Sequence, residues 1–148
     1  MTSTIEGIRD LIVDKLETLE ESGESIFGEV FGYPEGEFGS YPAAVVRPTG
    51  GSGNVRDTHR NERIFVIEIG LWQEVSEGGK TKQEASDKMI SSSDAILIAF
   101  DQDKDLGGEV QIVNVVNWGF DFSTAAGARE YATFVLEVRV LVPSYTPA

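Results

Sequence analysis

The sequence contains no cysteine and a single histidine. Without cysteine the chain can form neither a disulfide framework nor a thiolate metal site, and zinc normally needs several histidine or cysteine ligands. No Gly-x-Ser-x-Gly elbow supplies a serine nucleophile in place of the missing thiol. We therefore expect a protein that is not an enzyme, with no catalytic residues, no cofactor and no bound metal.

Basic residues and long apolar runs are also scarce. Lysine and arginine number 12 against 25 aspartates and glutamates, which gives a net charge of −13. A field of that sign repels phosphates, so the charge disfavours nucleic-acid binding. No apolar run approaches the roughly 20 residues that span a bilayer, and the first residues lack the pattern of a signal peptide. We expect a protein made and used without export, with no membrane partner.

The chain has the length and composition of one compact domain. It contains 148 residues, of which 41% are hydrophobic, enough to build one packed core. Two independent domains of half this length would each be poorly buried. We therefore treat residues 1–148 as a single domain.

Two segments show the apolar spacing of an amphipathic helix. The first starts at a capping-box pattern, Ser3 with Glu6, and is expected to stop near Ser22-Gly23. Its apolar face is predicted to contain Ile5, Ile8, Ile12, Leu16 and Leu19. The second starts at another capping box, Thr81 with Glu84. Its predicted face contains Ala85, Met89, Ser92 or Ser93, Ile96 and Phe100.

Five segments combine apolar residues with flanking turn residues, and we predict a strand at each. They are Ser25 to Tyr33, Tyr41 to Arg47, Glu62 to Gln73, Val110 to Phe120 and Tyr131 to Val142. We predict a flexible loop from Pro48 to Arg60 and a polar loop from Asp101 to Gly108.

Alternation along these strands predicts which side chains face the core. The predicted core positions are Phe65, Ile67, Ile69, Leu71, Phe134, Leu136, Val138 and Val140. In the strand from Val110, unbroken alternation would place Ile112 and Trp118 on the same side. The opposite sheet face, with Glu68 and Glu137, is expected to be wet or pressed against another subunit.

The predicted elements follow the order α-β-β-β-α-β-β. Because most strands are joined to their neighbours, this order predicts an α+β fold. We expect a mostly antiparallel β-sheet with both helices packed on one face.

One short motif is typical of a phosphate-binding loop. Gly79-Lys80-Thr81 lies between a predicted strand and a predicted helix, and it matches the end of that motif. The full motif requires a glycine where this chain has Glu74, whose carboxylate would repel phosphate. The capping box already accounts for Thr81, so a nucleotide site is disfavoured.

Three alternating aspartates are typical of the start of a calcium loop. They are Asp101, Asp103 and Asp105, but Leu106 stands where the turn glycine belongs and Ile112 where the bidentate glutamate belongs. A solvated acidic turn fits better, and a weak divalent-ion site is the alternative.

His59 lies close to Asp57, as a general base lies near its orienting carboxylate. Because the chain offers these residues no nucleophile, we interpret His59 as a polar loop residue.

Two groups of residues are candidates for an interface. A region of mixed charge is either a solvated hairpin arm or a docking arm whose charges set register with a partner. It contains Arg56, Asp57, Arg60, Glu62 and Arg63. Three aromatic residues in a Gly/Pro-rich stretch are either interface anchors or buried beneath the domain's own loops. They are Tyr33, Phe38 and Tyr41.

The order and character of these segments resemble the tail terminator and tail-completion (head-tail joining) proteins of long-tailed bacteriophages. The resemblance depends on a first helix, the strand Tyr41 to Pro48, the long strand Arg63 to Trp72, a second helix with Ala85 and Met89, and a closing strand pair. It covers most of the chain.

The resemblance implies a structural virion protein in the phage tail, assembled in the host cytoplasm. Such a protein forms a homo-oligomeric ring, typically a hexamer. The ring caps the tail tube and gives the head or neck a docking surface. The implied partners are other copies of the chain, the tail tube protein and the head/neck connector proteins. DNA would pass through the ring without specific binding, since an acidic wall repels phosphates.

Two alternatives remain open. One is another head-tail connector or a minor tail subunit. The other is a cellular small-ligand binding module, which would need a deep apolar pocket with converging polar groups.

Overall fold

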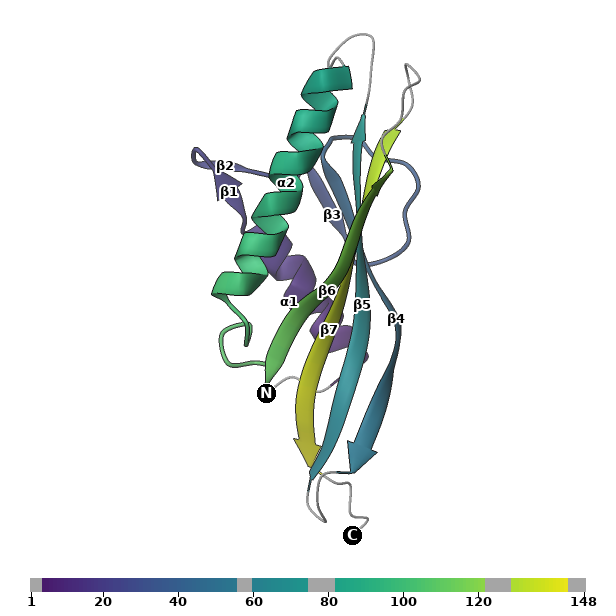
Figure 1. The fold of residues 1–148 in the computed structure, drawn as a ribbon, viewed down its shortest axis with the longest axis vertical. Helices are drawn as coiled ribbons and strands as arrows, with labels where there is room; N and C mark the ends of the chain where they lie inside the picture. Colours follow the sequence, from purple (N-terminus) through teal and green to yellow (C-terminus); the bar gives the residue numbers. More distant parts are fainter. Residues whose placement is uncertain (1–3, 56–59, 75–81, 122–128, 144–148) are drawn as a thin grey trace.

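The computed structural model describes residues 4–55, 60–74, 82–121 and 129–143 (Figure 1). It contains two long helices, α1 (Ile5–Glu17) and α2 (Lys82–Gln102). The strands are β1 (Glu20–Glu21), β2 (Glu24–Ser25), β3 (Glu29–Phe31), β4 (Ala43–Val55), β5 (Arg60–Glu74), β6 (Ile112–Asp121) and β7 (Arg129–Pro143).

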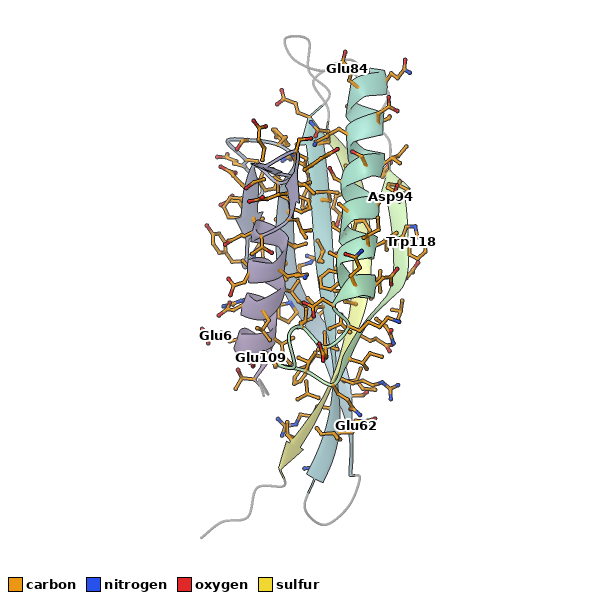
Figure 2. All side chains as sticks on the ribbon, turned by 90° about the vertical axis from the view of Figure 1, so that its left-hand side faces the viewer. Glu6, Glu62, Glu84, Asp94, Glu109 and Trp118 are labelled. Carbon is orange, nitrogen blue, oxygen red and sulfur yellow. The ribbon has the colours of Figure 1, made fainter. Side chains whose placement is uncertain are left out.

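Five strands form the main sheet, in the order β3-β4-β5-β7-β6. Its pairs are antiparallel except the short parallel pair of β3 and β4. The strands β1 and β2 form a separate hairpin. Both helices pack on one face of the sheet (Figures 1 and 2). The predicted α+β fold with a mostly antiparallel sheet is therefore confirmed.

The core lies between the helices and the sheet, where the alternation predicted it. Every second residue of β5 from Phe65 to Leu71 is buried, as is every second residue of β7 from Ala132 to Val142. The helices meet this face with fully or almost fully buried side chains. These are Ile8, Ile12, Leu16, Ala85, Met89, Ser92, Ser93, Ile96 and Phe100.

The first helix differs from its prediction at both ends. Its N-cap is Thr4, not Ser3, because the Thr4 hydroxyl accepts a hydrogen bond from the Gly7 N–H (3.0 Å). Ile5, which was predicted on the apolar face, is 55% exposed at the start of the helix. The helix ends at Glu17, followed by the C-cap residue Thr18. The predicted stop near Ser22-Gly23 was therefore wrong.

The Ser22-Gly23 pair instead forms the turn between β1 and β2. Both residues have positive φ, 56° and 82°, which is the conformation that two-residue hairpin turns require. The cross-strand pair Glu21 and Glu24 closes the turn. Gly23 does adopt the left-handed conformation that the sequence predicted, but it does so in a hairpin turn and not at the end of the helix.

The predicted loop from Pro48 to Arg60 was also wrong in most of its length, because β4 continues to Val55 and β5 begins at Arg60. A register shift between Pro48 and Gly50 marks a bulge, beyond which pairing with β5 resumes. Glycines have low strand propensity, but here the neighbouring long strand supplies the backbone partners. Strands β4, β5 and β7 form a long three-stranded ribbon. We call one end of it the arm, which contains residues 50–55, 60–66 and 137–143. Its tip runs beyond both helices (Figure 1).

The edge strand β6 differs from its prediction, because the alternation of its side chains is interrupted. Its register shifts between Val115 and Asn117, so Val116 is the extra residue of a bulge. Before the bulge Ile112 pairs with Arg139, and after it Trp118 pairs with the core residue Phe134. An extra residue reverses the alternation. Trp118 therefore lies on the helix-bearing face, opposite to Ile112.

The turn between α2 and β6 is held by Asp103. Its carboxylate accepts hydrogen bonds from the Gly107 N–H (3.0 Å) and from the Lys15 ammonium (3.1 Å). The bond from the Gly107 backbone, followed by that from Lys15, lowers the pKa of Asp103 below its ordinary value. Asp103 thus connects this turn to α1, and its carboxylate already has two donors.

We predict that Asp103→Asn lowers the free energy of unfolding by about 1 kcal/mol at neutral pH. Because the folded-state pKa is depressed, the carboxylate stabilises the fold above its unfolded pKa of about 3.9. The contribution is lost as the pH falls through the folded pKa. Urea unfolding from pH 7 downward measures the difference between the two proteins.

Asp101→Asn is the matched control, because Asp101 is exposed in the last turn of α2. We expect no loss of stability from it. A deficit of Asp103→Asn that stayed constant in strong acid would show that the carboxylate charge is not its cause.

Candidate functional site

The three predicted aromatic residues come together on the sheet face opposite the helices. They lie in or beside the loop from β3 to β4, and Phe38 is at the centre. Its ring centroid is 5.3 Å from that of Trp72, 5.8 Å from Phe31 and 5.9 Å from Tyr41. Tyr33 contacts Phe31 at 5.4 Å and is itself 57% exposed. The loop therefore packs onto the sheet through Phe38 and Tyr41, while Tyr33 stays on the surface.

Arg129 and Trp72 fix this loop on the sheet. The Arg129 guanidinium lies 5.4 Å from the centroid of the Phe38 ring and donates a hydrogen bond to the Gly36 carbonyl (2.8 Å). The Trp72 ring contacts Tyr131 at 4.5 Å. A Cβ at Gly70 would lie 2.7 Å from the Trp72 ring, so glycine is needed there. We call Phe31, Tyr33, Phe38, Tyr41, Trp72 and Tyr131 the aromatic cluster.

A cavity of about 380 Å³ opens beside the aromatic cluster. Loop residues 34–36 form one wall, and Trp72 and Tyr131 form part of another. Arg47 and Glu68 lie in it as an ion pair with an N–O distance of 2.7 Å. The Glu68 carboxylate raises the pKa of the Arg47 guanidinium. The two charges therefore neutralise one another inside the cavity.

Of the mixed-charge group, the structure describes the side chains of Glu62 and Arg63. Glu62 is almost buried, with an Arg139 nitrogen 3.5 Å from its carboxylate. Arg63 is exposed and lies opposite Gly53 on β4. Since neighbouring strand residues face opposite sides, Glu62 and Arg63 cannot act on one surface. Arg56, Asp57 and the Arg60 side chain lie outside the described residues.

The aromatic cluster and the arm are two separate sites. Trp72 and Glu62 lie ten positions apart on β5, so they are separated by about 30 Å at the rise of an extended strand. Each lies near one end of the long ribbon of β4, β5 and β7. A contact at one end is therefore independent of a contact at the other.

Two surfaces were missed by the sequence analysis. The first is the edge strand β6, where Val116 and Trp118 are 48% and 51% exposed. The signal that could have found it is the absence of lysine, arginine and proline along the strand. Such residues usually protect an exposed sheet edge from association.

The second missed surface is a groove of about 660 Å³ between the arm and the start of α1. Glycine-rich residues 50–53 of β4 form one side, and Ile5, Arg63 and Phe65 contribute to the rest. A Cβ at Gly51 would collide with the Ile64 carbonyl oxygen. The groove exists because these glycines lack side chains, and predicting a loop here concealed it.

Other candidates fall outside these surfaces. His59 and the Gly79-Lys80-Thr81 motif lie outside the described residues. Within the described part, no group of three or more acidic or histidine side chains is placed to hold a metal ion. Neither α1 nor α2 is both long enough and apolar enough to cross a membrane.

A scan against protein-family models gives no match for this chain, and a search of curated proteins gives none either. The function must therefore be argued from the residues and surfaces described above.

We predict that Phe38→Ala detaches the aromatic loop from the sheet. Trp72 and Trp118 are the chain's two tryptophans, so a Trp118→Phe background leaves Trp72 as the fluorescent reporter. Losing Phe38 exposes the Trp72 ring, and its emission should move to longer wavelength. The free energy of unfolding should fall by about 2 kcal/mol.

Tyr33→Ala serves as the control, since this exposed residue contacts the cluster only at its rim. We expect an unchanged Trp72 emission and a stability change within about 0.5 kcal/mol. If both variants behaved alike, Phe38 would not be the residue that fixes the loop.

Proposed function

We propose that this protein is a structural subunit of a long-tailed bacteriophage. Copies of the chain form a ring, typically six-fold, that caps the tail tube and offers the head or neck a docking surface. The observation that best supports this is the open sheet with two unlike edges. One edge is β6, and the other is the part of β4 that follows residue 45. Unlike edges allow each copy to contact the next in the same way, and such contacts form a ring when the rotation between copies closes.

The charge of the helix layer is compatible with a channel for DNA. The exposed acidic residues of α1 are Glu6, Asp10, Asp14 and Glu17, and those of α2 are Glu84, Asp87, Asp94 and Asp101. The chain as a whole has a net charge of −13. A channel wall with this surface repels phosphates and lets DNA slide past.

The same observations are compatible with other positions in the virion. A different head-tail connector or a minor tail subunit would also need unlike edges and an acidic surface. A small-ligand binding module is supported only by the cavity at Arg47 and Glu68. Since those two charges are already paired with one another, we place this function last.

The experiment is to mix purified protein with tail tubes assembled from the tube protein of the same phage. We expect rings on tube ends in negative-stain images, and tubes that no longer elongate when more tube protein is added. Tube protein without the chain is the control, and its tubes should keep growing.

Deleting the gene separates the virion positions. Overlong or headless tails support a terminator, while empty heads lacking tails support a connector. A chain that never joins tubes, and whose loss leaves particles unchanged, would refute a structural role in the virion.

A further inference from the structure

One edge of the sheet has the character of a contact surface. Strand β6 is ten residues long and lies at one edge of the sheet. In the part of the chain that the structure describes, its outer edge pairs with no strand. It exposes Val116 and Trp118, and the Val116 bulge is its only protective device against edge pairing. A large exposed tryptophan on such an edge is typical of an interface anchor.

The other edge provides a matching depression. Strand β3 pairs only with residues 43–45 of β4. After residue 45, within the described ranges, the outer edge of β4 has no partner strand. The groove at residues 50–53 lies on this edge, with the Phe65 ring and the exposed Ile5 contributing apolar surface. Its volume of about 660 Å³ leaves room for a large side chain.

Charge favours the same pairing. Among the described residues, Arg63 is the one charged residue that lines the groove, and it is exposed. On the side of Trp118, the acidic residue Asp94 lies on the neighbouring helix α2 (Figure 2). An acidic residue thus lies beside the protruding tryptophan, and a basic residue borders the depression. Such complementarity steers and orients two partners.

We propose that the edge strand β6 of one copy docks on the β4 edge of a second copy, with Trp118 inserted into the glycine-lined groove. This inference rests on the self-association in the proposed function and names its two surfaces. Because the edge and the groove are different surfaces, one copy keeps its groove free after the first contact and the other keeps its edge free. The contact is therefore heterologous and repeats around a ring.

The first test uses two variants that each destroy one half of the contact. Trp118→Lys removes the anchor. Gly53→Phe fills the groove, and its Cβ fits because the nearest atom, the Glu62 carbonyl oxygen, is 3.6 Å away. Sedimentation velocity should show self-association of each variant weakened roughly tenfold or more.

Mixing the two variants gives the decisive result. Trp118→Lys retains an intact groove and Gly53→Phe retains an intact edge, so the mixture should form a one-to-one dimer and stop there. Ile90→Lys, at an exposed apolar position on α2, is the control and should associate like the original chain. If Gly53→Phe associates normally alone, or the mixture stays monomeric while the original chain associates, the proposal is wrong.

The second test uses the absence of cysteine. In the Gly53→Cys/Gly119→Cys variant, which keeps the Trp118 anchor and whose new Cβ at position 119 meets no atom within 4 Å, a short thiol-reactive cross-linker should join copies into a ladder of oligomers. Each single-cysteine variant should stay uncrosslinked. Dimers from Gly119→Cys alone would mean that two β6 edges meet, and no cross-link in any variant would mean that this contact is absent. Either result overturns the proposal.

The same preparations separate this inference from the proposed function. Rings on tube ends without the 53–119 cross-link would leave the tail role standing and reject the contact. A cross-linked ladder from a chain that ignores tail tubes would keep the contact and reject the tail role. Circular dichroism of every variant distinguishes a lost contact from a lost fold.

Discussion

The antiparallel pairing of β5 with β7 is the constraint on which the rest of the structure depends. It runs without a break from Arg60 opposite Pro143 to Glu74 opposite Arg129. One face of this pair supplies most of the core beneath the two helices. The other face supports the aromatic cluster at one end, and the arm extends from the opposite end. Both candidate surfaces are therefore placed by a single ladder of backbone hydrogen bonds.

The sequence predicted what periodicity can encode. Alternation in β5 and β7 and the helical spacing of Ile8, Ile12 and Leu16 identified the core positions, because a buried face must be apolar at the period of its own element. The fold class followed from the order of those elements. These signals are local. They suffice to predict the core positions of an element when one of its faces is buried along its whole length.

What the sequence could not predict depends on partners far along the chain. Residues 50–53 look like a loop, and they become a strand only because β5 lies beside them. The bulge at Val116 is visible only in the register with β7. The role of Phe38 depends on Trp72 and Arg129, which lie distant in sequence. The structure brings the candidate aromatics together, but neither their contacts nor the groove could be read from composition.

The position of β7 in the sheet also has a consequence for how the chain folds. The β4–β5 hairpin forms from neighbouring residues, whereas β7 joins β5 only after α2 and β6 lie between them in the chain. Contacts between distant segments require a large loop to close first, and they slow folding. During synthesis, β5 therefore waits with one open edge and an apolar face until β7 has been made. We therefore expect the insertion of this strand into the centre of the sheet to be a slow step of folding.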